Sequence, residues 1–421
     1  MDFVITIQHA ANVHFFKHVV TELEAAGHDV YVFAREKGVT GELLDAYDID
    51  HELLCDEPSG WFELGVTQLC YEARLLRRAH AIDPDYVLTS HGIAATHVST
   101  LVGAESHVYI DTETAINGGN RLTIPFTDAL YTPNSFRESY GDAHVDYPGY
   151  HELAYLHPDR FEPNPDLLRR YGVDPHEQYA VLRVGAWNGN HDLGKAGIST
   201  AGRRTIVDEL GADGRVYVSD EGNGPIPAGA DPLPVPPEAF HHLLAFADLV
   251  VGEVATTTLE AGLLGTPTVR ISPFAGSTEM GKFRELEAYG LVRSFHTDSE
   301  RDAIDELKRL VRDPHAATIW ANRRAALLET KVDVTQYILS QLLEDVPEPT
   351  PTDRDPDSNL TVPNSSGPDP GSTPKSGLSL SKPTPTPTPT PTPSSNSNRN
   401  RNQNQSQNQN QTHTQDRNRR R

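Results

Sequence analysis

Three consecutive threonines and a glutamate in the second half of the chain combine groups that suit phosphate and sugar. Residues 247–272 read ADLVVGEVATTTLEAGLLGTPTVRIS, which predicts a strand at 248–251, a helix stopped by Gly265 and a second strand. Thr256, Thr257 and Thr258 stand where that helix should begin. Free N–H groups at a helix N-terminus attract phosphate, and Glu260, one turn further in, is positioned to accept hydrogen bonds from a sugar diol. The alternative interpretation is ordinary helix capping by the threonines and a solvated Glu260.

A second set of polar residues follows predicted strands in the first half of the chain. The carboxyl ends of parallel strands meet at one edge of a sheet, where α/β proteins bind ligands. The candidate general bases there are His9, Asp111 and Glu113, and the candidate substrate-binding residues are Asn12, His14 and His91. Two alternatives stay open: Asp111 caps the next helix while Glu113 is solvated, and a loop histidine serves structure only.

A polar, glycine-containing loop opens the second half. After a predicted strand at 179–184 comes GAWNGNHD, in which glycine allows the backbone to approach a ligand closely. Asn188, His191 and Asp192 are therefore candidate substrate-binding residues. Their alternative role is to hold the loop in place.

The predicted elements that position these residues alternate between strands and helices. Residues 2–7 form an apolar strand, 13–26 carry a helical stripe ended by Gly27, and 30–34 form the next strand. This opening predicts a parallel sheet with right-handed crossovers, which we expect to finish at Pro133-Asn134. No G-x-G-x-x-G motif follows the first strand, so a classical dinucleotide fingerprint is missing.

The pattern restarts in the second half, which predicts an α/β protein of two Rossmann-like, doubly wound domains facing a cleft. We expect an acceptor-side domain at 1–148, a connection at 149–178 and a nucleotide-side domain at 179–346. From 347 onward apolar residues become rare, and a proline-threonine repeat and an Asn/Gln/Ser run predict a disordered tail at 347–421.

Composition excludes several classes of protein. The 421 residues carry a formal net charge of −23, and lysine is scarce, which predicts adaptation to high salt and argues against nucleic-acid binding. No apolar run is long enough to span a membrane, and no His/Cys/carboxylate spacing resembles a metal site. With Cys55 and Cys70 as the only cysteines and no signal peptide, we expect a cytoplasmic protein without metal or cofactor.

Longer motifs resemble a known family. They are NVHFFKHVVTELEAAGHDV, HVYIDTETA, NRLTIPFTDALYTPNSF, YPGYHELAYLHP, RVGAWNGNHDLGKAGIS and TTTLEAGLLGTPTVR, in this order over residues 1–343. Together they resemble domain of unknown function family 354, a largely archaeal, uncharacterised group. That family is similar to a branch of the GT-B superfamily, with UDP-N-acetylglucosamine 2-epimerases and MurG-type glycosyltransferases as relatives.

The resemblance implies a nucleotide-binding second domain. By analogy with those relatives, Thr256, Thr257 and Thr258 match the helix start that meets the diphosphate, and Glu260 matches the ribose-binding glutamate. The epimerases carry an arginine in the loop after the first strand, where this chain has Gln8 to Asn12 without one, and this counts against epimerisation.

Three functions follow as hypotheses. The first is a metal-independent glycosyltransferase-like enzyme whose substrate is a nucleotide sugar, expected to be UDP-linked, with an unidentified acceptor. The second is a nucleotide-sugar 2-epimerase-like enzyme, which the Asp111 and Glu113 pair permits. The third is a non-catalytic scaffold that binds a nucleotide sugar.

Overall fold

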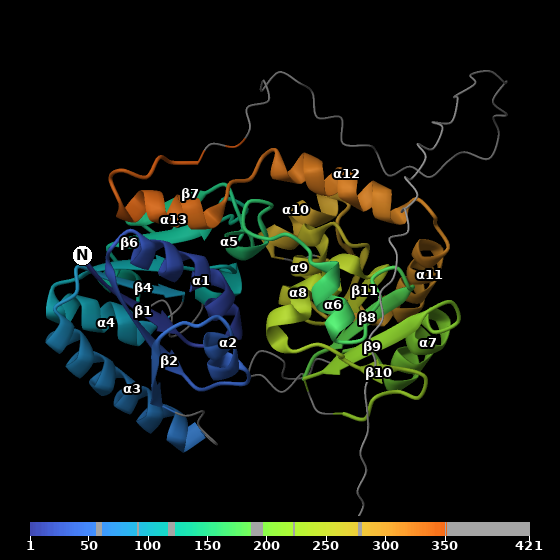
Figure 1. The fold of residues 1–421 in the computed structure, drawn as a ribbon, viewed down its shortest axis with the longest axis horizontal. Coiled ribbons are helices and arrows are strands. Elements are labelled where there is room, and N and C mark those ends of the chain that lie inside the picture. Colours follow the sequence, from blue (N-terminus) through green and yellow to red (C-terminus); the bar gives the residue numbers. More distant parts are fainter. Residues whose placement is uncertain are drawn as a thin grey trace, which may run out of the picture. The chain divides into compact units, whose positions relative to one another are not determined.

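The computed structural model describes residues 1–55, 61–90, 92–116, 123–186, 197–221, 224–276, 280–349 and 351 (Figure 1). These residues form two parallel β-sheets with helices packed against them. Of the expected tail, all but residues 347–349 and 351 lies outside the described residues. Among the described helices, none is long and apolar enough to cross a membrane.

The first sheet has seven parallel strands in the order β3-β2-β1-β4-β5-β6-β7. Their bounds are β1 (Asp2–Ile7), β2 (Asp29–Arg35), β3 (His51–Cys55), β4 (Tyr86–Ser90), β5 (Glu105–Tyr109), β6 (Ala129–Pro133) and β7 (His144–Tyr147). The strand order changes direction between β1 and β4, which opens a ligand crevice at their carboxyl ends. The polar ends of β1, β4 and β5 therefore share one edge, as the sequence predicts.

The sheet does not finish at Pro133-Asn134, where we expected it to. β7 adds to β6 in parallel, with Leu130 opposite His144 and Pro133 opposite Tyr147. The four residues HVDY carry no apolar run, and their side chains are mostly half-buried or exposed at this edge of the sheet. A short edge strand of this kind has no periodic signal in the sequence.

Helices accompany this sheet: α1 (Ala10–Ala25), α2 (Thr40–Ala46), α3 (Trp61–Ile82) and α4 (Ile93–Val102). The predicted stripe of α1 is confirmed, because its members are buried in the core, namely Val13, Phe16, Val19, Val20 and Leu23. Gly27 ends this segment with a φ of 85°, in the left-handed region that glycine adopts without strain.

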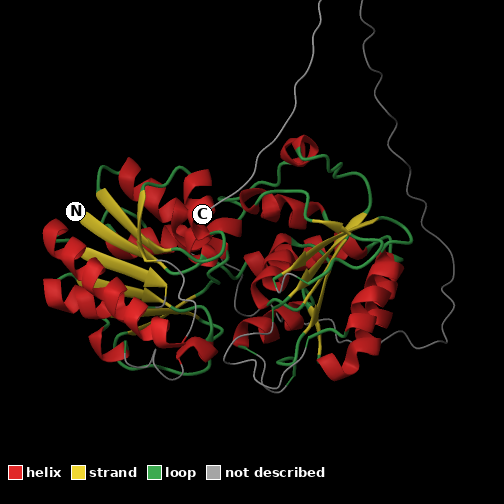
Figure 2. Cartoon of the chain, turned by 90° about the horizontal axis from the view of Figure 1, so that it is seen from below, coloured by secondary structure: helices red, strands yellow, loops and turns green. Residues whose placement is uncertain are grey.

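The second sheet has six parallel strands in the order β10-β9-β8-β11-β12-β13. Their bounds are β8 (Tyr179–Val184), β9 (Arg215–Asp220), β10 (Asp231–Pro232), β11 (Leu249–Gly252), β12 (Thr268–Ile271) and β13 (Arg293–Phe295). The helices of this half are α7 (Thr200–Leu210), α8 (Phe240–Phe246), α9 (Ala255–Leu264), α10 (Gly281–Tyr289) and α11 (Glu300–Val311). Gly265 ends α9 at a φ of 81°, as predicted. Figure 2 shows the strands of both sheets and the helices around them.

Two short helices, α5 (Leu153–Leu156) and α6 (Pro165–Arg170), lie in the chain between the sheets, and α12 (Ala316–Leu328) and α13 (Val334–Leu342) end the described body. We expected the segment of α13 within the range of the second domain. It instead packs on α1 and α5 and, through Tyr337, on tyrosines of β6 and β7. The Thr335 hydroxyl donates to the carbonyl of Ala154 over 2.8 Å. The end of the body thus packs on the first half, a pairing that no local pattern encodes.

Candidate functional site

The start of α9 opens on a cavity of about 390 Å³ that both halves of the chain line. The N-cap residue Val254 provides no side-chain hydrogen bond, so no N-cap side chain bonds the first N–H groups of the helix. The polar lining comes from both halves, namely His14, Arg183, Ser219, Glu221, His241, Thr256, Thr257 and Glu260. Two of the three predicted threonines and the predicted glutamate therefore meet in one cavity, beside an uncapped helix start.

Thr258 does not belong to this lining. Its side chain is fully buried, and its hydroxyl donates to the carbonyls of Val254 and Ala255, each over 3.0 Å. Its methyl group packs toward Gly252, where any Cβ would lie 2.8 Å from it. The prediction of a ligand contact for Thr258 therefore does not fit the structure, because the residue faces the strand behind the helix.

Glu260 is 5% exposed and is held by two donors from other elements. The Tyr155 hydroxyl donates to its Oε1 over 2.7 Å, and His241 Nε2 lies 3.0 Å from the same oxygen. Burial, with Glu260 as the next cause, keeps the pKa of Tyr155 well above 10, so the phenol stays a donor. Oε2 accepts no hydrogen bond from any residue that the structure describes.

His14 reaches the cavity from α1, and its ring contacts Tyr155 and His241, the two partners of Glu260. Its ring lies 4.6 Å from that of His241 and 5.3 Å from that of Tyr155, measured between centroids. Its Nδ1 is 3.2 Å from the Tyr47 hydroxyl. Burial, with smaller effects of His241 and Lys17, holds the pKa of His14 well below 6.5, so the ring is neutral at neutral pH.

The predicted bases Asp111 and Glu113 bind the start of α10 and do not line the cavity. Lys282 Nζ lies 3.1 Å from Asp111 Oδ2, and the Gly281 N–H donates to Glu113 Oε1 over 3.1 Å. Both carboxylates come from the first half and both partners from the second. The alternative of a solvated Glu113 is therefore wrong, because its carboxylate meets the positive end of a helix.

Glu152, which sequence reasoning missed, completes this group. It lies 3.6 Å from Lys282 Nζ, is 3% exposed, and its Oε2 is buried without a described hydrogen-bond partner. Burial raises the pKa of Glu152. The Lys282 ammonium lowers this pKa in part, and the Asp111 carboxylate raises it further. Although burial disfavours the ammonium, Asp111 and Glu152 raise the pKa of Lys282.

The remaining predicted residues divide into two sets. His9 is the N-cap residue of α1, and Asn12 is buried with its Oδ1 accepting from the Gln8 N–H over 3.1 Å, so Asn12 holds its own loop. Neither residue lines the cavity. The other four candidates lie outside the described residues, namely His91, Asn188, His191 and Asp192.

The structure adds an arginine to the cavity that sequence reasoning did not single out. Arg183 donates to the Ser219 hydroxyl and, over 2.7 Å, to Glu221 Oε1. Apolar side chains complete this side of the lining, namely Leu233, Val235, Pro236 and Phe240. The lining is therefore polar at α9 and mixed along the segments from β8 to α8.

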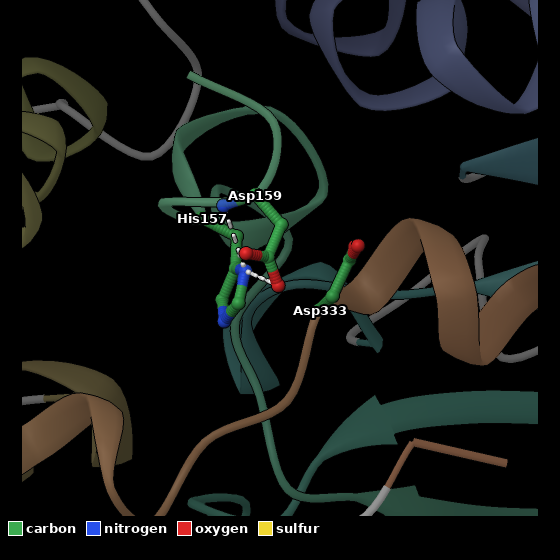
Figure 3. A group of neighbouring side chains, drawn as sticks. All are labelled: His157, Asp159 and Asp333. Carbon is green, nitrogen blue, oxygen red and sulfur yellow. Dashed lines mark hydrogen bonds and ion pairs between the residues drawn. The ribbon is translucent and has the colours of Figure 1, made fainter. Parts of the chain in front are cut away.

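One group of side chains has a composition that suits a metal ion. One ligand atom each from His157, Asp159 and Asp333 lies within 4.8 Å of the others (Figure 3). Protein donors already contact two of the three residues: Arg160 Nε is 2.5 Å from Asp333 Oδ2, and the Asp159 N–H donates to His157 Nδ1 over 3.3 Å. We assign no cation site to this group.

Residues 1–283 match the family described as "Protein of unknown function (DUF354)". The chain belongs to this family. It is also 21% identical over 290 residues to the uncharacterised protein MJ0665 of Methanocaldococcus jannaschii, across 65% of this chain and 82% of that protein. The resemblance expected from the sequence motifs is thereby confirmed.

Solved structures share the architecture of this DUF354 protein at low identity. The spinosyn forosaminyltransferase SpnP superposes with a TM-score of 0.57 at 16% identity, over 81% of this chain and 98% of SpnP. UDP-GlcNAc 2-epimerase from Neisseria meningitidis, bound to UDP-GlcNAc, superposes with a TM-score of 0.56 at 13% identity, over 82% and 100% of the two chains. The GT-B fold predicted for this protein is confirmed.

Proposed function

We propose that this DUF354 protein binds a nucleoside-diphosphate sugar in the cavity at the start of α9. The diphosphate meets the uncapped helix start with Thr256 and Thr257, and the ribose meets Glu260. The observation that carries the proposal is that these three residues line one cavity together with His14 of the first half. We propose that the acceptor approaches this ligand from the first half, which also lines the cavity.

The reaction that we propose is sugar transfer. An acceptor hydroxyl attacks the anomeric carbon, the bond from that carbon to the diphosphate oxygen breaks, and the acceptor proton passes to a base. Helix N–H groups and threonine hydroxyls stabilise the charge that develops on the leaving diphosphate. We place His14 beside the ribose, because its ring contacts Tyr155 and His241, the two partners of Glu260. Asp111 pairs with Lys282 and does not line the cavity, and we retain it as the candidate base for an acceptor that binds beyond this lining. We assign Glu113 to holding α10 in place.

Calorimetric titration of the full chain in molar KCl, with UDP, GDP, ADP and CDP in turn, tests the proposal. We expect saturable binding of one nucleotide. Glu260→Gln keeps the side-chain volume and an acceptor for Tyr155 and His241, and should weaken that binding about tenfold through loss of a charge-assisted hydrogen bond. Glu285→Gln is the matched control, since Glu285 accepts from Tyr150 and Lys331 and does not line the cavity. Binding of no nucleotide would refute the proposal.

One observation favours epimerisation as a second candidate. Asp111 and Glu152 both contact Lys282, and burial raises the pKa of Glu152, so one carboxyl group can hold a proton beside an ionised partner. Neither residue lines the cavity, so the sugar would have to extend beyond that lining to reach Asp111, the more exposed of the two. An epimerase removes a proton from a sugar carbon and returns one to the opposite face. Incubation with UDP-GlcNAc in heavy water would then place deuterium on that carbon, whereas a transferase without acceptor would place none.

A further inference from the structure

The carboxylate of Glu260 has one oxygen occupied by the protein and one oxygen available to a ligand. A carboxylate oxygen has two acceptor positions, and Oε1 receives two donors, the Tyr155 hydroxyl at 2.7 Å and His241 Nε2 at 3.0 Å. Among the described residues, none donates to Oε2, and Glu260 lines the cavity. The oxygen that a ligand meets is therefore Oε2.

The two donors come from elements that packing holds in place. Tyr155 lies in α5, in the chain between the sheets, and is 2% exposed, while His241 lies in α8 and is 3% exposed. The two rings lie 5.2 Å apart, and His14 of α1 contacts both. Turning Oε1 toward a ligand would leave two buried donors without an acceptor, which is unfavourable.

A ribose diol pairs with a carboxylate through two parallel hydrogen bonds only when both oxygens are available. The two acceptor positions of one oxygen diverge too widely to suit two vicinal hydroxyls at once, so Oε2 alone serves one of them. We infer that Glu260 reads a single ribose hydroxyl through Oε2, and that Tyr155 and His241 are positioning residues that set this specificity. The inference rests on the proposed function. It predicts that the site also binds a donor nucleotide that lacks the hydroxyl not bound by Glu260. If that hydroxyl is the 2′-hydroxyl, 2′-deoxyribonucleotide sugars are among the substrates.

The test uses the ribonucleoside diphosphate that binds in the titrations above, with its 2′-deoxy and 3′-deoxy analogues, on the full chain. We expect one analogue to lose about tenfold or more in affinity, the range for hydrogen bonds to charged groups, and the other to stay within about threefold of the parent. A loss of tenfold or more for both analogues would mean that both oxygens are used, and no loss for either would mean that Glu260 does not read the ribose. Each of these two results overturns the inference and leaves nucleotide binding intact.

Tyr155→Phe gives a second test, because the relative affinities of the two analogues would stay unchanged if Tyr155 served the fold alone. Without the phenol, Oε1 regains an acceptor position and the carboxylate can turn, so the tolerated analogue should now lose about tenfold relative to the parent. Tyr150→Phe is the matched control, because this equally buried hydroxyl donates to Glu285 instead. An unchanged analogue pattern in Tyr155→Phe would overturn the positioning role. If the parent nucleotide does not bind the unmodified chain, the proposed function fails and this inference fails with it.

Discussion

Lys282 offers a quantitative test of the buried charges that join the two halves. The residue is 3% exposed, with Asp111 at 3.1 Å and Glu152 at 3.6 Å. At an effective dielectric constant near 20, each contact is attractive by ~5 kcal/mol, and desolvation of the three groups offsets much of this. Removing one partner of such a group typically destabilises a protein by ~3–5 kcal/mol, because the remaining charge stays buried. We expect this loss for Lys282→Met at about pH 7.

The loss should depend on pH in a defined direction. Burial already raises the pKa of Glu152, and removal of the ammonium raises it further. A carboxyl group whose folded pKa lies above its unfolded value contributes stability that is present at low pH and is lost as pH rises through the folded pKa. The variant should therefore recover relative to the unmodified chain on acidification, by about 1–2 kcal/mol between pH 7 and pH 5.

Urea unfolding at fixed KCl, followed by tryptophan fluorescence at both pH values, measures these differences. Lys308→Met is the matched control, because Lys308 is 30% exposed and pairs with Glu209 at 3.0 Å on the surface. That exposed pair should contribute at most ~1 kcal/mol, with little change between the two pH values. A loss below ~1 kcal/mol for Lys282→Met, or a loss of equal size at both pH values, would refute the reasoning.

Three further perturbations test other contacts. Gly281→Ala should destabilise the protein by ~2 kcal/mol in urea unfolding, because the added Cβ would overlap the Ser135 carbonyl. Gly65→Ala in α3 is the control and should stabilise by ~0.5–1 kcal/mol, because no atom lies within 4 Å of its Cβ. Equal effects of the two substitutions would contradict this prediction. The unfolded chain takes up a proton at His14 below about pH 6.5, whereas the buried ring of the folded protein stays neutral, so acidification destabilises the protein. His14→Phe should reduce this loss in the free energy of unfolding by up to ~1.4 kcal/mol per pH unit. An unchanged slope of the free energy of unfolding against pH would contradict this prediction. Glu253→Gln should destabilise by ~1–3 kcal/mol and speed amide exchange at Gly185 and Ile198, whose N–H groups both donate to this carboxylate; unaltered exchange at both amides would contradict it.

Local patterns were sufficient for most of the architecture. The stripe of α1 and the stop at Gly265 depend on side chains a few residues apart, so their periodicity is visible in the sequence. β7 and β10 escaped prediction because a strand of two to four residues at a sheet edge has no apolar run. The packing of α13 on the first half was not predictable for another reason, since its partners are more than 170 residues away in the chain.

The candidate site was predictable in part. Thr256, Thr257 and Glu260 follow from one strand–helix unit, because the positions of a helix start and of a residue one turn later are fixed by local geometry. Thr258 follows the same local rule and yet faces β11, since the rotation of the helix about its axis depends on packing. Asp111 and Glu113 were correctly placed after β5, but their partners on α10 were not foreseeable.

The sequence by itself determined the two parallel α/β halves, the family and the residues at the start of α9. Only the tertiary structure decided which residues surround Glu260 and Lys282. Tyr155 is 105 residues from Glu260, and Asp111 is 171 residues from Lys282. Secondary structure arises from interactions within a few turns of chain, whereas the hydrogen-bonding state of a buried carboxylate depends on which distant elements pack against it.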